Sequence, residues 1–111
     1  MTDKIIAVDF DGTLCEDAYP EIGQARYDVM QRLYEEIELG AKVILWTCRT
    51  GERLKEAVVW CEEHGILFNA VNENLPEVIA EYGGADSRKV TADEYWDDKA
   101  VNVNYWNGRK K

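Results

Sequence analysis

Two carboxylates stand two residues apart at the end of an apolar run, in the segment Asp9-Phe10-Asp11-Gly12-Thr13. Side chains at positions i and i+2 of an extended segment point to the same side. Two like charges this close are costly unless a cation joins them or one carboxylate is protonated. The pattern therefore implies Mg²⁺, a shared proton or a lysine from elsewhere in the chain. An isolated Asp-x-Asp is more often a solvated acidic loop, so the choice depends on the rest of the sequence.

Four further residues stand after other apolar runs or in the loops beside them. Thr47 ends the run 42–47, where its hydroxyl and the following amides can hold a phosphate oxygen, and Lys89 can neutralise an anionic pocket. Asp97 and Asp98 follow another apolar stretch. Alone, each has an ordinary explanation, as a strand threonine, a surface lysine or an acidic turn. Together, four acids, a hydroxyl and a lysine at predicted strand ends indicate a site for a hard cation and a phosphoryl group.

Other residues near this set have two interpretations each. Arg49 lies two residues beyond Thr47, and it either reaches a second anionic group of a ligand or is a solvated or helix-capping arginine. The segment 72–74 either lines the mouth of the site or, as we favour, caps the next helix through Asn74. Trp106 is expected to pack on the sheet edge or on a second subunit.

The spacing of apolar residues predicts strands and helices in alternation. Strands are predicted over residues 4–9, 42–47, 66–71 and 93–96, with a final edge strand over 101–105. Helices are predicted over residues 24–39, over 54–61 with His64-Gly65 as the closing signal, and from Asn74 to the glycines at 83–84. Residues 15–24 are interpreted as a short connection that leads into the first helix, and residues 109–111 as a frayed tail.

This order of elements predicts an α/β fold, a single three-layer, Rossmann-like domain over residues 1–111 with a mainly parallel sheet and no cap domain. Ligands of such sheets bind beyond the carboxyl ends of the strands. The polar residues at those ends are therefore expected to converge on one edge of the sheet: Asp9, Asp11, Thr47, Asn72 and Asp97.

Composition and charge limit the class of partner. The chain of 111 residues fits one domain, and its 13 Lys and Arg against 22 Asp and Glu give a net charge of −9. This charge repels phosphate backbones, so nucleic acid is not expected as a partner. The apolar runs are too short for a membrane span or a signal peptide, and three cysteines are too few for a disulfide framework. We therefore expect a cytoplasmic protein that does not bind membranes.

The segment Asp9 to Leu14 (Asp-Phe-Asp-Gly-Thr-Leu) resembles the first motif of the haloacid dehalogenase-like (HAD) phosphatases. The apolar strand that ends in Thr47 resembles their second motif, and Lys89 and the pair at 97–98 resemble the third and fourth. Residues 89–100 also resemble a small bacterial and phage subgroup of this family. The resemblance spans residues 5–100, and four motifs in the family's order make it specific.

This resemblance implies a role for each motif residue. Asp9 is implied as the nucleophile that forms an aspartyl-phosphate. Asp11 is implied as the acid that protonates the leaving group and then as the base that activates water. Thr47 and Lys89 are implied to bind the phosphoryl oxygens, and Lys89 also to offset the charge of the nucleophile.

The implied cofactor is Mg²⁺. The resemblance implies that Asp9, the backbone carbonyl of Asp11 and Asp97 bind this ion. Asp98 would either bind the ion directly or lie next to the residues that do. The implied function is hydrolysis of a small phosphate monoester, since the acid at position 11 favours phosphate esters over dehalogenation. Only residues 15–24 separate the first motif from the first predicted helix, and no long insertion follows the second strand, so the chain resembles a member of the family without a cap. Loops or a second copy of the chain would then select the substrate.

Two alternatives to an enzyme stay open. A receiver-like phosphoacceptor also combines acids, Mg²⁺, a threonine and a lysine, but it carries its phosphorylated aspartate on the third strand, where this chain has Val71-Asn72. A HAD scaffold that binds a partner without catalysis is the other alternative, and it would not require every motif position to be filled.

Overall fold

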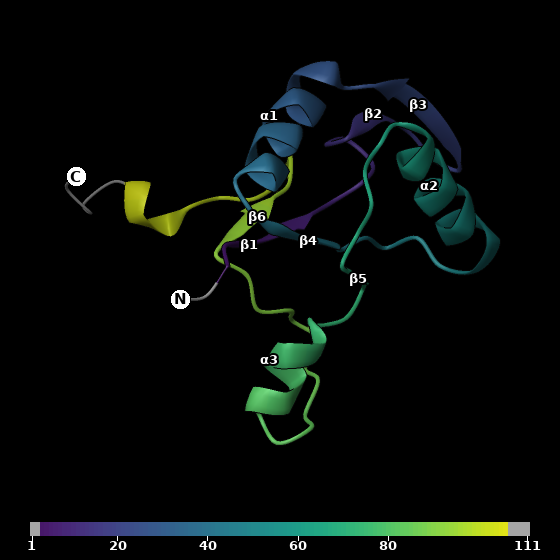
Figure 1. Ribbon diagram of the computed structural model, residues 1–111. Coiled ribbons are helices and arrows are strands. Elements are labelled where there is room, and N and C mark those ends of the chain that lie inside the picture. Colours follow the sequence, from purple (N-terminus) through teal and green to yellow (C-terminus); the bar gives the residue numbers. More distant parts are fainter. Residues whose placement is uncertain (1–2, 107–111) are drawn as a thin grey trace.

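A four-stranded parallel sheet forms the centre of the computed structural model, which describes residues 3–106 (Figure 1). The elements in chain order are β1 (Ile5–Val8), β2 (Cys15–Ala18), β3 (Glu21–Ala25), α1 (Tyr27–Glu38), β4 (Lys42–Leu45), α2 (Gly51–Glu63), β5 (Ala70–Val71), α3 (Pro76–Glu81), β6 (Glu94–Trp96) and a 3₁₀ turn at Val103–Tyr105. No helix in this part of the chain combines the length and the apolar character that crossing a membrane requires. The tail predicted at 109–111 lies outside the described residues.

The strands of the sheet lie in the order β5-β4-β1-β6. On one side of β1, Ile6 stands opposite Val43 of β4, and on the other side it stands opposite Glu94 of β6, with both pairings parallel. The chain therefore builds outward from β1 through β4 to β5, and then returns to the far side of β1. Such a reversal point is where open α/β sheets bind their ligands, beyond the carboxyl ends of the strands.

Buried side chains alternate between the two faces of the sheet. Ile6 and Val8 of β1 belong to a core with buried residues of α1 and α2. Ala7 of β1 and Ile44 of β4 belong to a second core, with Val78 of α3. The sheet thus lies between α1 and α2 on one face and α3 on the other (Figure 1). The predicted three-layer α/β fold with a mainly parallel sheet is confirmed, and the described residues contain no second domain.

A β-hairpin forms where the sequence predicts only a short connection and the start of a helix. Strands β2 and β3 pair in antiparallel fashion, with an irregular register between Cys15 and Asp17. Helix α1 begins at Tyr27 and not at Gln24, because the preceding residues are extended. Most of the hairpin is exposed, so it lacks the apolar alternation by which a half-buried strand is recognised.

Of two strands predicted from the sequence, the one at 66–71 is shorter than expected and the one at 101–105 does not form. Only Ala70–Val71 of the strand predicted over 66–71 pairs with β4, and the side-chain oxygen of Asn69 accepts a hydrogen bond from the backbone amide of Val43 at 2.8 Å. No edge strand forms over 101–105, because the side chain of Asn102 bonds the backbone amide two residues on and closes a turn. Trp106 beyond that turn is 57% exposed, so it is not packed into the sheet edge, and the alternative, packing on a second subunit, stays a prediction.

The three cysteines are all free thiols, but they differ in exposure. Cys15 and Cys61 are buried in the core, and Cys48 is exposed. Burial raises the pKa of the Cys15 thiol, and it raises the pKa of Cys61 to about 12. The two core thiols therefore behave as small apolar side chains.

Candidate active site

Asp9 follows β1 directly and is held between two neighbouring strands. Its backbone amide donates to the carbonyl of Trp96 at 2.9 Å, which extends the pairing with β6 by one residue. The next residue, Phe10, is fully buried and meets the ring of Trp60 edge-on, with ring centroids 5.4 Å apart. A buried strand before it and a buried ring after it fix Asp9 at the carboxyl edge of the sheet, where its side chain is partly buried.

Three carboxylates meet at this edge. Asp9 follows β1, and Asp97 and Asp98 follow the adjacent strand β6; one oxygen from each lies within 4.8 Å of the others. The parallel pairing of the two strands brings these residues together although nearly ninety positions separate them in the sequence. The predicted convergence of Asp9 with Asp97 is thereby confirmed, and Asp98 joins them.

The electrostatics of this cluster are unfavourable for an ionised Asp9. Burial raises the pKa of Asp9 to about 6, and the charges of Asp97, Asp11 and Asp98 add to the effect, against a hydrogen bond from the amide of Phe10. Three carboxylate oxygens within a few ångströms form the hard donor set that Mg²⁺ prefers, and a divalent cation would relieve this repulsion. The residues present therefore fit such an ion.

The end of β4 contributes Thr47, which is ordered by the end of β5. The backbone amide of Thr47 donates to the side-chain oxygen of Asn72 at 2.8 Å, and its hydroxyl accepts from the amide of Arg49 at 3.2 Å. Asn72 has a φ of 55°, a left-handed conformation that asparagine tolerates better than most residues. Asn72 thus orders the loop after β4, and it lies at the sheet edge where the strand pattern predicts it.

Lys89 approaches the cluster from the loop before β6. It lies over the ring of Tyr95, with its amine 5.7 Å from the ring centroid. Lys89, Asp9 and Asp97 line one cavity of about 310 Å³, together with the aromatic side chains Trp46, Tyr95 and Trp96. The structure therefore brings the predicted lysine to the same cavity as the central carboxylate.

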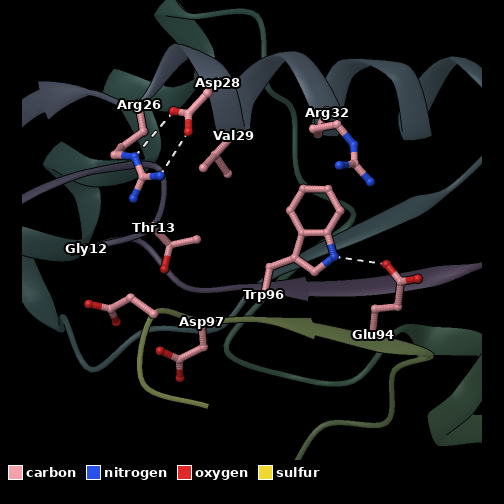
Figure 2. A pocket seen from close by; sticks show the side chains of 10 residues that line it. Gly12, Thr13, Arg26, Asp28, Val29, Arg32, Glu94, Trp96 and Asp97 are labelled. Atoms are coloured by element: carbon pink, nitrogen blue, oxygen red, sulfur yellow. Dashed lines mark hydrogen bonds and ion pairs between the residues drawn. The ribbon is translucent and has the colours of Figure 1, made fainter. Parts of the chain in front are cut away.

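A second cavity, of about 430 Å³, lies on the other side of β6 against α1 (Figure 2). Asp97 and Trp96 line both cavities, so the two adjoin at the acidic cluster. Figure 2 shows Arg32 of α1 beside the indole of Trp96, while Arg26 is paired with Asp28 at 2.9 Å. Sequence reasoning missed these lining residues. The position of Trp96 directly before two acids is the signal that could have identified it, whereas Arg26 follows a hairpin that the pattern did not predict.

Gly12 allows Asp98 to approach the turn after β1. The φ of Gly12 is +86°, and a Cβ atom built there would lie 2.4 Å from Oδ2 of Asp98. A larger residue would force the carboxylate to move, so the glycine of the first motif has a steric role at the cluster. Thr13 beside it is buried, and its hydroxyl finds no hydrogen-bond partner among the described residues.

The structure places Arg49 differently from either interpretation of the sequence. Its side chain is 1% exposed, so it is not solvated, and it does not open onto either cavity. Its guanidinium instead forms a two-pronged contact with Asp11, from Nε to Oδ2 at 2.8 Å and from Nη2 to Oδ1 at 2.7 Å. The expectation that Arg49 reaches a second anionic group of a ligand does not fit this geometry, because its donors are already used inside the protein.

The segment 72–74 also differs from expectation. The helix after it is α3, whose N-cap is Leu75, without a side-chain hydrogen bond. Asn74 is buried and instead accepts from the amide of Thr91 at 2.7 Å and donates to Asp86 at 2.8 Å. The helix-capping interpretation of Asn74 was wrong: the residue fastens the loop that carries Lys89.

Comparisons with known proteins give one informative relative. No protein-family model matches the sequence, and no curated protein is significantly similar to it. The solved structure of a conserved protein from Bacteroides thetaiotaomicron is similar, with a TM-score of 0.78 and 41% sequence identity over 90% of this chain and 79% of that chain. At this identity and coverage, the chain belongs to the same protein family as the conserved Bacteroides thetaiotaomicron protein.

Proposed function

We propose that the protein is a Mg²⁺-dependent phosphohydrolase of the HAD type that cleaves a small phosphate monoester through an aspartyl-phosphate. The observation that carries the proposal is the meeting of Asp9, Asp97 and Asp98 within 4.8 Å at the carboxyl edge of the sheet. Lys89 lines the same cavity as Asp9, which supports binding of a phosphoryl group beside the acids. The resemblance of the four motifs to HAD phosphatases supplies the order of the chemistry.

Asp9 and Asp11 would carry the covalent steps. A carboxylate oxygen of Asp9 attacks phosphorus, the bond from phosphorus to the ester oxygen breaks, and that oxygen takes a proton from Asp11. A water molecule then attacks phosphorus, giving its proton to Asp11, and the bond to Asp9 breaks to release inorganic phosphate. With a pKa of about 6, Asp9 is ionised near neutral pH, as attack requires.

The remaining residues would bind and neutralise charge. Asp9, Asp97, Asp98 and the backbone carbonyl of Asp11 would hold Mg²⁺, which when bound offsets the negative charge of the phosphoryl oxygens. Thr47 and Lys89 would hold those oxygens from the side of β4 and from the loop before β6. Both cavities at the cluster are open to a small ligand, and this agrees with a metabolite-sized substrate.

The proposal extends to the setting of the protein. A cytoplasmic location accords with three free thiols. The net charge of −9 disfavours nucleic acid as substrate. A second copy of the chain is a candidate for covering the open site, since the described residues include no cap.

Turnover of p-nitrophenyl phosphate with and without Mg²⁺ tests the proposal. We expect Mg²⁺-dependent release of p-nitrophenol by the wild type and a loss of at least about 10³-fold in Asp9→Asn, because an amide cannot attack phosphorus. Asp3→Asn is the matched control: Asp3 is an exposed acid just before β1, at the opposite end of the strand, and its removal should leave turnover unchanged.

Other outcomes would identify the alternatives. Activity of Asp9→Asn within about tenfold of the wild type would contradict the nucleophile assignment. Single phosphorylation of Asp9 by a small phosphodonor, without turnover, would instead indicate a receiver-like phosphoacceptor. Neither phosphorylation nor turnover with any member of a phosphometabolite panel would favour a binding scaffold.

A further inference from the structure

Arg49 is a fully buried cation in a strongly acidic chain. It ranks among the largest completely buried side chains, in a protein of net charge −9. A buried guanidinium is tolerated only when it is paired and its donors are satisfied. Its two contacts with the carboxylate of Asp11, at 2.8 and 2.7 Å, provide the pairing and engage both oxygens of that carboxylate. Such a two-pronged contact fixes the plane of a carboxylate as well as its position.

The same guanidinium is bound to the β2–β3 hairpin. It donates to the backbone carbonyl of Pro20 at 3.2 Å and to that of Glu21 at 2.8 Å, at the tip of the hairpin. Its central carbon lies 5.0 Å from the ring centroids of Phe10 and Tyr19. Rings and carbonyls therefore hold the guanidinium, and the guanidinium in turn holds Asp11.

We propose that Arg49 is a positioning residue, which orients the Asp11 carboxylate for proton transfer and ties that orientation to the tip of the β2–β3 hairpin. The inference rests on the proposed function, in which Asp11 moves the proton to and from the leaving group. Arg49 does not touch the substrate; it acts on the reaction only through Asp11. A side chain that served stability alone would make the same contacts, so the test has to separate these two roles.

The dependence of kcat/KM on the leaving group separates a positioning role of Arg49 from a purely stabilising one. Nitrophenolate leaves readily without a proton, whereas an alkyl alkoxide needs one. The ratio kcat/KM reports the step in which the leaving group departs, provided that this is the first irreversible step. A misoriented Asp11 should therefore lower kcat/KM much more for β-glycerophosphate than for p-nitrophenyl phosphate. A general loss of folded protein would lower both equally.

The experiment is a double-mutant cycle with both substrates in saturating Mg²⁺. The variants are Arg49→Met, Arg49→Lys, Asp11→Asn and the two combinations of Asp11→Asn with a change at 49, and the melting temperature of each is measured alongside. Arg49→Lys keeps the positive charge but loses the planar two-pronged contact. Arg53→Met is the matched control, because Arg53 lies close by in the chain, in helix α2, and within the described residues its ion pair is with Glu56 of that same helix, away from Asp11 and the hairpin.

We expect both changes at position 49 to lower kcat/KM at least about tenfold more for β-glycerophosphate than for p-nitrophenyl phosphate. In the Asp11→Asn background, the same changes should alter kcat/KM by less than about twofold, because the group through which Arg49 acts is gone. The changes at position 49 should still lower the melting temperature in the Asp11→Asn background. The contribution of Arg49 to stability is thereby measured separately from its effect on proton transfer. Arg53→Met should change neither quantity.

Equal losses for both substrates, or losses that multiply with that of Asp11→Asn, would overturn the positioning role while leaving the proposed function intact. If Arg49→Met does not fold, Arg49→Lys decides between the same outcomes. Absence of turnover by the wild type would overturn the proposed function, and the role of Arg49 with it. The wild-type measurement thus distinguishes failure of the proposed function from failure of the positioning role alone.

Discussion

Asp9 couples the stability of the protein to pH, because its ionised form is unfavourable in the folded chain. Burial and three neighbouring carboxylates raise its pKa to about 6, from an ordinary value of 3.8. Below about pH 4 the group is protonated whether the chain is folded or unfolded. Between about pH 4 and 6, it ionises in the unfolded chain but stays protonated in the folded one. The unfolding free energy contributed by Asp9 therefore falls as pH rises through this window.

This pH dependence is measurable by chemical denaturation in EDTA. The difference in unfolding free energy between the wild type and Asp9→Asn should fall from pH 4 to about pH 6.5 and level off above it, since the amide does not titrate. Excess Mg²⁺ should reduce the fall, because the cation favours the ionised carboxylate. A difference that stays constant with pH would contradict the electrostatic description of the cluster.

At the scale of single residues, the sequence predicted the acids better than the arginine. Asp9 and Asp97 could be placed because each ends an apolar run, and parallel strands end at a common edge. Arg49 could not be placed, because its partners are Asp11 and the backbone of a hairpin that no pattern indicated. A residue whose contacts are backbone carbonyls far away in the sequence leaves no periodic signal.

Among the connecting elements, the loop between α3 and β6 matters most to the site because it carries Lys89. Asn74 fastens this loop through Asp86 and the amide of Thr91, and Asn74 is almost fully buried. Removal of its amide would break these part-buried hydrogen bonds to Asp86 and Thr91, which costs about 1–3 kcal/mol.

We therefore expect Asn74→Ala to lower the unfolding free energy by about 1–3 kcal/mol. We also expect it to lower kcat/KM several-fold, since Lys89 would be less firmly held. Glu73→Ala, at the exposed neighbouring position, is the control and should change little. Urea denaturation and initial rates of p-nitrophenyl phosphate hydrolysis measure the two effects. Equal effects of the two substitutions would show that the hydrogen bonds of Asn74 do not order the loop.

The elements themselves were predictable where burial imposes a pattern. Strands β1 and β4 and helices α1 and α2 have apolar spacing that matches their period, and all four were found close to their predicted bounds. The hairpin was missed because it is largely exposed, and the strand predicted at 101–105 was wrong because alternation without a partner strand does not make a sheet. Local hydrogen bonds of Asn102 favoured a turn there.

At the scale of the whole molecule, the net charge of −9 and the three carboxylates that meet at the sheet edge predict a strong response to divalent cations. A cation that binds only the folded chain raises its stability by RT ln(1 + [L]/Kd), which is about 2.7 kcal/mol at a hundredfold excess over Kd. We expect millimolar Mg²⁺ to raise the melting temperature by several degrees over EDTA, with KCl at equal ionic strength as the control for screening.

The site specificity of this effect can be tested with the same variants. Asp9→Asn should lose most of the Mg²⁺-dependent increase, and Asp3→Asn should keep it. An increase that is equal in both, or that KCl reproduces, would mean that Mg²⁺ acts on the net charge of −9 and not on the cluster.

The uneven exposure of the three thiols has a practical consequence. Cys15 and Cys61 are enclosed in the core, and burial holds the pKa of Cys61 at about 12, so neither presents a thiolate to a reagent in the native state. Cys48 is exposed, and it lies in the chain between Thr47 and Arg49. The unmodified protein thus offers one native attachment point for a fluorescent or spin label. That label would lie between Thr47, which we propose to bind the phosphoryl group, and Arg49, which contacts the tip of the hairpin.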